Sequence, residues 1–168
     1  MNWMKKVAVA LVCLLPLGLQ AAKVDTLQVK SPSMNKSIEV VVVSPDMAAT
    51  EACPVIYLLH GYGGNARTWV GIKPDLPKIA DEKGIFFVCP DGKNTWYWDS
   101  PLNADVRYET FISDELVKYV DSHYKTVADR KGRAITGLSM GGHGAMWNGL
   151  RHSDVFSAAG STSGGVDI

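Results

Sequence analysis

The segment Gly137-Leu-Ser-Met-Gly141 places a serine between two glycines in the pattern G-x-S-x-G. Arg133–Thr136 before it is expected to be a strand, and Met140–Arg151 after it a helix. A chain that turns from strand to helix within one residue leaves no room for Cβ atoms at the flanking positions, and it lifts the serine hydroxyl clear of the sheet. The pattern predicts that Ser139 is mounted as a nucleophile for acyl chemistry. The alternative is a flexible glycine-rich turn.

Such a serine also needs N–H donors for the negative charge that develops on the attacked carbonyl oxygen. Each donor is typically worth about 10²–10³ in rate. The amide of Met140 directly follows the serine at the positive end of the expected helix. A second donor should come from the loop after an earlier strand, Val55–Leu59, and the amide of Tyr62 is our candidate.

A competing interpretation is a dinucleotide-binding loop, because residues 61–66 (GYGGNA) fit G-x-G-x-x-G/A and two acidic residues follow about 20 positions later. That motif must open a helix immediately, whereas Gly71, Pro74 and Pro77 interrupt the following segment. The acidic pair Asp81 and Glu82 also lies in a helical pattern rather than at the end of a strand. We therefore reject this interpretation.

Hydrophobic patterning predicts strands that alternate with helices along the chain. The expected strands are 38–43, 55–59, 85–88, 133–136 and 156–159, and the expected helices are 75–83, 109–124 and 140–151. This alternation indicates an α/β fold with a parallel sheet and crossover connections. Ligands in such folds bind at the carboxyl edge of the sheet, where the glycine-rich segments lie.

The composition suggests a single domain, which we place at residues 22–168. The chain has 168 residues, 46% of them hydrophobic, and equal numbers of acidic and basic side chains. Its length and apolar content allow a sizeable core. The balanced charge argues against nucleic acid as a partner.

Residues 1–21 have the layout of a secretory signal peptide. Two lysines precede an apolar run at Val7–Leu19, and small residues follow that allow cleavage after Ala21 or Ala22. The run is shorter than the roughly 20 apolar residues that span a membrane. We expect a secreted or periplasmic protein, not held in the membrane after cleavage, that begins near Ala22 or Lys23.

Two cysteines remain after removal of the signal, Cys53 and Cys89. Cys53 begins one expected strand and Cys89 ends the next, so they should lie at opposite edges of the sheet. The ends of a strand are about 17 Å apart, whereas a disulfide requires Cα atoms within roughly 7 Å. We expect two buried thiols rather than a disulfide.

The chain resembles the putative esterase family of α/β-hydrolases, which includes acetyl-xylan, feruloyl and tributyrin-type esterases, S-formylglutathione hydrolases and mycolyltransferases. The resemblance covers nearly all of residues 40–165. The segments that carry it are YLLHGYGG (57–64), PDGKNTWYWDSP (90–101), YETFISDELVKYVDSHY (108–124) and ITGLSMGGHGA (135–145).

This resemblance implies an α/β-hydrolase fold, a mostly parallel sheet with flanking helices. It implies a nucleophilic role for Ser139, oxyanion-hole roles for the Tyr62 and Met140 amides, and hydrolysis of acyl esters through an acyl-enzyme. It further implies a small-molecule or glycan-linked ester as substrate, and neither a metal nor a cofactor.

None of the four histidines suits the general base that Ser139 requires. His152 lies roughly 20 Å along the expected helix. His143 lies on the helix body, where a packing role is expected. His60 should brace the loop that contains Tyr62, and His123 ends a helix.

The resemblance places the missing acid and base on further strands. We therefore expect the chain to be the N-terminal portion of a longer esterase, or a truncated product, that lacks the last strands and helices. By itself it should be inactive or very weak, with an open hydrophobic sheet edge.

The aromatic residues Trp69, Trp96, Tyr97 and Trp98 lie near the expected strand ends. They could form an apolar wall for an aryl or sugar-linked acyl group, or they could pack over the sheet edge. Export favours carbohydrate-linked acetyl or feruloyl esters, or simple short-chain esters, over S-formylglutathione. Two alternatives remain open: an acyltransferase that uses the same serine, and a catalytically inactive carbohydrate-binding relative.

Overall fold

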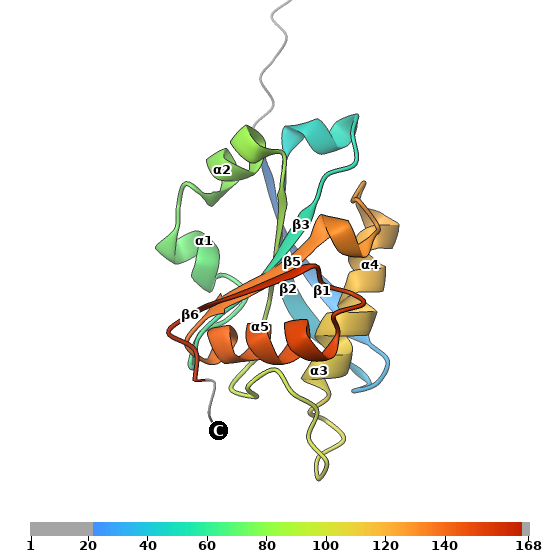
Figure 1. Cartoon of the computed structure of the whole chain (residues 1–168), viewed down its shortest axis with the longest axis vertical. Helices are drawn as coiled ribbons and strands as arrows, with labels where there is room; N and C mark the ends of the chain where they lie inside the picture. The colour runs from blue at the N-terminus through green and yellow to red at the C-terminus, as the bar shows by residue number, and fades with distance from the viewer. Residues whose placement is uncertain (1–21, 166–168) are drawn as a thin grey trace, which may run out of the picture.

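The structure is a computed structural model that describes residues 22–165 (Figure 1). The predicted signal peptide, residues 1–21, lies outside the described residues. Within the described part, no helix combines the length and apolar character needed to cross a membrane. The strands are β1 (Lys23–Ser31), β2 (Lys36–Ser44), β3 (Val55–Leu59), β4 (Phe86–Pro90), β5 (Arg133–Leu138) and β6 (Ala158–Thr162). The α-helices are α1 (Thr68–Ile72), α2 (Leu76–Lys83), α3 (Tyr108–Thr110), α4 (Leu116–His123) and α5 (Met140–Arg151).

The six strands form one sheet in the order β1-β2-β4-β3-β5-β6. Strands β4, β3, β5 and β6 pair in parallel, whereas β1 with β2 and β2 with β4 are antiparallel. The predicted α/β class with a mostly parallel sheet is confirmed.

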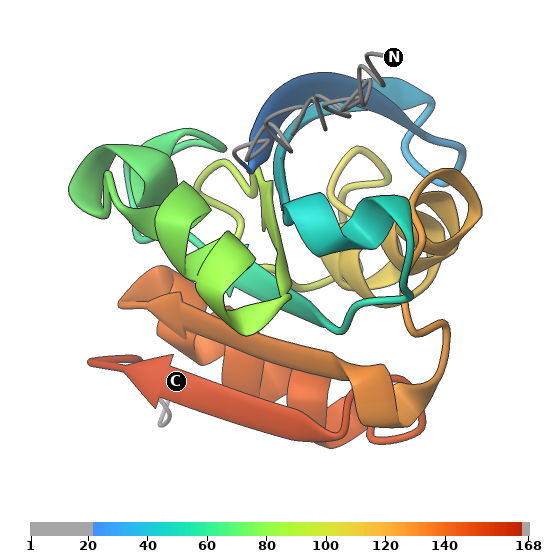
Figure 2. The same cartoon turned by 90° about the horizontal axis from the view of Figure 1, so that it is seen from above.

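Helices cover both faces of this sheet (Figure 2). Alternate residues of β2 point to opposite faces, so Val41 and Val43 pack with Leu76 and Ala80 of α2. Val40 and Val42 belong to the larger core on the other face, which includes residues of α4 and of α5. The sheet is therefore the middle layer of three.

The sheet order creates a switch point between β3 and β5. From β3 the chain passes through α1 and α2 to β4 on one side, and from β5 it passes through α5 to β6 on the other side. Because the connections that follow these two neighbouring parallel strands lead away in opposite directions, a crevice forms at the carboxyl ends of the strands. Ser139 follows β5 and His60 follows β3, so both border this crevice.

Several boundaries differ from those predicted. The expected helix 109–124 is observed as continuous helical structure from α3 through a π-helix (Phe111–Glu115) to α4. Strand β1 was not predicted, because only Leu27 and Val29 on its inward side are apolar. Helix α1 was not predicted either: Gly71, expected to interrupt this segment, lies within its short helix. Strand β6 begins two residues later than predicted, because Phe156 lies in the core and contacts Tyr57 edge to face.

Strand β6 forms one edge of the described sheet. Its five side chains are those of alanine, glycine, serine and threonine, and most of its positions are exposed. The edge is thus open, but the expectation that it would be hydrophobic is wrong, because small residues occupy it.

Cys53 and Cys89 are both buried free thiols, as expected. Cys53 precedes β3, and its backbone pairs with that of Thr126 in an isolated β-bridge, whereas Cys89 lies in β4. Burial raises the pKa of both thiols above the ordinary value.

Candidate active site

Ser139 occupies the single residue between β5 and α5 and is exposed. Its backbone angles are φ 54° and ψ −119°, a conformation that side-chain-bearing residues rarely adopt. The Ser139 N–H donates to the Thr162 carbonyl at 2.8 Å, and the Ser139 carbonyl accepts from the His143 N–H at 3.0 Å. The neighbouring strand and the first turn of α5 therefore hold the strained residue in place.

The two flanking glycines are sterically required. A Cβ at Gly141 would overlap the Leu59 carbonyl and lie 2.6 Å from the His60 carbonyl oxygen. A Cβ at Gly137 would overlap the Gly141 backbone and lie 2.8 Å from the Leu59 oxygen. The steric reason predicted for these glycines is confirmed.

The segment 61–64 forms a tight turn directly beside Ser139. The Gly64 N–H donates to the Gly61 carbonyl at 3.0 Å, and Gly63 has φ +76°, as a glycine at the third position of a type II turn does. A Cβ built on Gly61 would lie 3.5 Å from the Ser139 Cβ. The structure thus brings the turn containing Tyr62 against the serine.

The amides of Tyr62 and Met140 have no hydrogen-bond acceptor within residues 22–165. Met140 is the first residue of α5, so its N–H has no partner inside the helix. The Tyr62 N–H shares a planar peptide unit with the Gly61 carbonyl, and the two point in opposite directions. Because the Gly61 carbonyl is hydrogen-bonded within its own loop, the Tyr62 N–H points out of that loop.

His60 braces this turn, as the sequence predicted. Its ring is 1% exposed, and Nδ1 donates to the Gly61 carbonyl at 2.7 Å. Nε2 accepts from the Gly92 N–H at 2.9 Å. A ring that donates at one nitrogen and accepts at the other is the neutral imidazole with its proton on Nδ1.

The loop after β4 holds the turn from the other side. The Tyr97 hydroxyl donates to the His60 carbonyl at 3.0 Å, and the Gly63 N–H donates to Asn94 Oδ1 at 2.7 Å. Tyr97 is fully buried, and its carbonyl accepts from Asn148 of α5 at 3.0 Å. Trp96 and Tyr97 both have a left-handed backbone conformation, with φ 58° and 61°.

These contacts show that Tyr97 ties the turn, the loop after β4 and the helix after the serine together. Backbone strain in consecutive residues is kept only where the surroundings enforce it. Sequence reasoning missed this function of Tyr97. The available signal was an aromatic residue between two tryptophans immediately after a buried strand.

Within the described residues, no histidine side chain is hydrogen-bonded to the Ser139 hydroxyl. His143 is buried, donates from Nδ1 to the Gly165 carbonyl at 2.8 Å and packs among tryptophan rings. His152 contacts Glu109 at 2.9 Å at the far end of α5. His123 stacks on Tyr119 at the end of α4. These positions agree with the prediction that none of them is the base.

The aromatic residues expected near the strand ends, Trp69, Trp96, Tyr97 and Trp98, do not form one cluster. Trp69 packs against the core on the α2 face, whereas Trp96 packs against the core on the opposite face. Trp98 is 38% exposed and meets Trp147 of α5 edge to face, with ring centroids 6.1 Å apart. Of the expected wall, Trp98 is the most accessible part.

The sheet order, with a strained and exposed serine between a strand and a helix, defines the α/β-hydrolase class. The family description "Putative esterase" matches residues 31–168. The chain therefore belongs to the putative esterase family.

Known relatives agree with this membership. An esterase of Mycobacterium tuberculosis is 30% identical over 148 residues, which cover 84% of this chain and 32% of that protein. The diacylglycerol acyltransferase/mycolyltransferase Ag85A of Mycobacterium leprae is 32% identical over 158 residues, or 86% of this chain and 44% of that protein. A solved ferulic acid esterase matches with a TM-score of 0.70 and 32% identity, over 82% of this chain and 58% of that one. The chain thus spans less than two thirds of each.

Proposed function

We propose that the protein is an exported serine carboxylesterase that uses Ser139 as its nucleophile. The observation that carries this proposal is the exposed serine in a strained turn, next to two backbone N–H groups that have no acceptor in the described chain. The Ser139 oxygen would attack the ester carbonyl carbon and pass its proton to a base. The Tyr62 and Met140 amides would bind the resulting oxyanion.

On collapse of this intermediate the protonated base would give its proton to the leaving oxygen, so that the alcohol departs and an acyl group remains on Ser139. Water would then release the acid in a second step. The four histidines lie at positions unsuited to accept the proton, so we propose that the base and its acidic partner come from outside these residues. The chain alone should turn over esters very slowly.

The first test maps acylation rather than turnover. The chain is incubated with a fluorophosphonate probe, with and without added imidazole as a replacement base, and the labelled residue is identified by peptide mass spectrometry. We expect the label on Ser139, faster with imidazole, and none in Ser139→Ala. A matched control is Ser163→Ala, which removes another serine with positive φ near the same edge. Label spread evenly over exposed serines would contradict the proposal.

The second test removes one amide. Tyr62 is the second residue of its turn, a position that tolerates proline, and proline has no N–H. Tyr62→Pro should slow acylation of Ser139 by about 10²–10³ relative to Tyr62→Ala, which keeps the amide. Equal rates for the two variants would exclude the Tyr62 N–H from the oxyanion hole.

One of the similar solved structures is a ferulic acid esterase, which supports a carbohydrate-linked aryl ester as substrate. The similarity to a mycolyltransferase supports a second candidate, transfer of the acyl group to a sugar alcohol instead of water. Product analysis with methyl ferulate and a sugar acceptor distinguishes them. Free acid alone indicates an esterase, whereas a new sugar ester indicates an acyltransferase.

Export is proposed from the signal-like residues 1–21. Expression of the whole chain in a bacterial host, followed by N-terminal sequencing of the secreted or periplasmic product, tests it. We expect a start at Ala22 or Lys23. An uncleaved cytoplasmic product would contradict export.

A further inference from the structure

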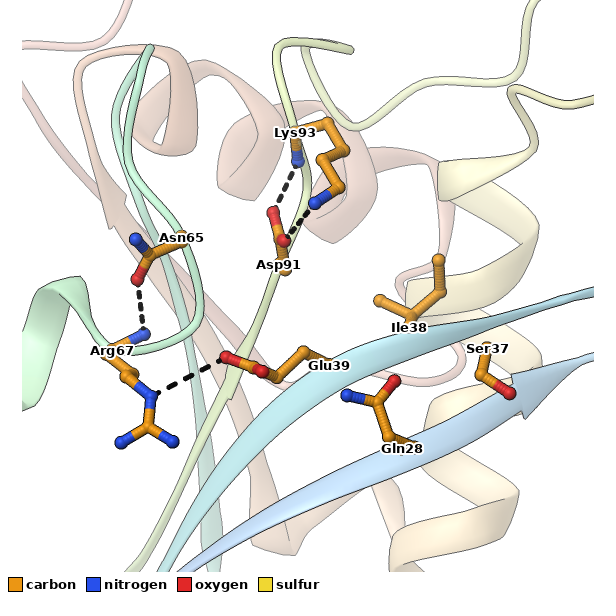
Figure 3. A pocket seen from close by; sticks show the side chains of 8 residues that line it. All are labelled: Gln28, Ser37, Ile38, Glu39, Asn65, Arg67, Asp91 and Lys93. Atoms are coloured by element: carbon orange, nitrogen blue, oxygen red, sulfur yellow. Dashed lines mark hydrogen bonds and ion pairs between the residues drawn. The ribbon is translucent and has the colours of Figure 1, made fainter.

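A polar cavity of about 410 Å³ lies at the ends of β2 and β4 (Figure 3). In the sheet order these strands are on one side of β3, whereas β5, which precedes Ser139, is on the other. Its volume is in the range of small-molecule binding pockets, about 300–1,000 Å³. It is lined by Gln28, Ser37, Ile38, Glu39, Asn65, Arg67, Asp91 and Lys93. These residues come from β1, β2 and the segments after β3 and β4, so the cavity opens at the sheet edge that carries Ser139.

The charges of the cavity balance one another. Glu39 faces Arg67 with an N–O distance of 3.8 Å, and Asp91 faces Lys93 at 2.6 Å. Burial alone would raise the pKa of Asp91, but the hydrogen bonds that it accepts from the Lys93 backbone N–H and the Lys93 ammonium hold it well below its ordinary value. Asp91 therefore stays ionised at neutral pH. Two acids and two bases leave no net charge to attract an ionic ligand.

Several hydrogen-bonding groups in the cavity have no partner within residues 22–165. They are the Gln28 amide, the Ser37 hydroxyl, the Asn65 NH₂ group and the outer nitrogens of Arg67. Planar side chains that carry two neighbouring donors or acceptors can bind two adjacent hydroxyls at once. A pocket lined in this way suits a ligand rich in hydroxyl groups. It is unsuited to an aryl ring.

We propose that this cavity is a sugar-binding subsite for the alcohol portion of the ester, at a distance from the reacting bond. The proposal rests on the proposed function at Ser139. Between β5, which ends at Ser139, and β2 lie three strand spacings of about 4.8 Å, or about 14 Å in total. A glycan that crosses the turn at 61–64 could occupy the cavity while an ester several sugar units away reaches Ser139. Tyr62, which is 67% exposed, lies on this path.

The test measures binding without any ester. Isothermal titration of the chain with xylohexaose and with mannohexaose, two neutral oligosaccharides, is compared with the double variant Glu39→Gln/Arg67→Gln. That variant removes one acid and one base, so net charge is unchanged. The matched control is Lys78→Gln/Glu82→Gln, which removes an exposed ion pair of 3.5 Å on α2, outside the cavity.

We expect at least one of the two oligosaccharides to bind, with an affinity at least about tenfold weaker in the cavity variant and unchanged in the control. Thermal unfolding of each variant checks that the fold is intact. Binding to neither oligosaccharide, or equal affinity in the cavity variant, would overturn the proposal.

Failure here is separable from failure of the proposed esterase. Ser139→Ala should bind the oligosaccharide as tightly as the parent chain, and the cavity variant should still be labelled at Ser139. Loss of Ser139 labelling with oligosaccharide binding retained would reject the nucleophile but keep the subsite. Labelling of Ser139 without oligosaccharide binding would reject the subsite but keep the nucleophile.

Discussion

Replacement of Gly141 by alanine tests the close packing behind the serine most directly. The added Cβ would overlap the Leu59 carbonyl and lie 2.6 Å from the His60 oxygen. Both are backbone groups: Leu59 ends β3, and the His60 carbonyl directly after it accepts from the Tyr97 hydroxyl, so neither can move away as a flexible side chain could. Overpacking typically costs about 1–3 kcal/mol and more where the surroundings are rigid. We expect Gly141→Ala to lose at least about 3 kcal/mol.

Gly71 in α1 provides the opposite case. A Cβ there meets no atom within 4 Å, and alanine favours the helix by about 0.4–1 kcal/mol over glycine. For a chain of this size, 1 kcal/mol shifts Tm by about 2–4 °C. Thermal unfolding followed by circular dichroism should therefore show Gly141→Ala at least about 6 °C below the parent and Gly71→Ala slightly above it.

Fluorophosphonate labelling of Ser139 at a temperature where both variants are folded completes the experiment. Labelling should fall in Gly141→Ala, because the displaced backbone carries the serine and the turn at 61–64, and it should be unchanged in Gly71→Ala. A Gly141→Ala protein that unfolds within about 2 °C of the parent and is labelled equally fast would refute the reasoning.

Three further predictions concern the surroundings of the site. Tyr97→Phe leaves the buried His60 carbonyl without the Tyr97 hydroxyl as donor, so the free energy of unfolding in urea should fall by about 1–3 kcal/mol. An unchanged urea midpoint would show that this hydrogen bond does not stabilise the fold. Burial alone would raise the pKa of Glu109, but hydrogen bonds from Arg151, Trp147 and His152 lower it. The stability that ionised Glu109 supplies is therefore present above the unfolded-state pKa and is lost as pH falls through the lower folded-state pKa. The midpoint of urea unfolding should therefore change less between pH 6 and pH 3 in Glu109→Gln than in the parent chain. Cys53 and Cys89 should resist a thiol reagent in the native chain lacking residues 1–21 and react fully in denaturant; rapid native reaction would contradict their burial.

Much of the fold followed from local signals in the sequence. Strand β3 and helix α5 have the predicted bounds. Helix α2 ends at Lys83, and Gly84 directly after it has φ +62°, which explains the predicted stop. Of the elements that were missed, α1 is a short helix of five residues. Strand β1 carries few inward apolar residues and is defined by pairing with β2 along its whole length. Such pairing depends on contacts distant in sequence, which periodicity cannot detect.

The candidate site was predictable where backbone geometry dictates residue type. The glycines at 137 and 141 identify the turn that carries Ser139, because no other side chain fits. The role of Tyr97 was not predictable in this way. Its hydroxyl reaches the His60 carbonyl only through a left-handed pair of residues, and tryptophan and tyrosine give no sequence signal for that conformation. The residues of the cavity come from four segments that only the folded sheet brings together.

Under the proposed function, the strained pair at Trp96 and Tyr97 has a consequence for how substrate preference could diverge. Tyr97 is fixed by contacts with the His60 carbonyl and with Asn148 of α5, so changes there would disturb the turn beside Ser139 together with the loop. Trp98 and Leu102, which are 38% and 96% exposed, follow on the same loop and carry no such constraint. Adaptation to new esters, in nature or in a directed-evolution library, should therefore accumulate at the outer part of this loop while its inner anchor stays aromatic and hydroxylated.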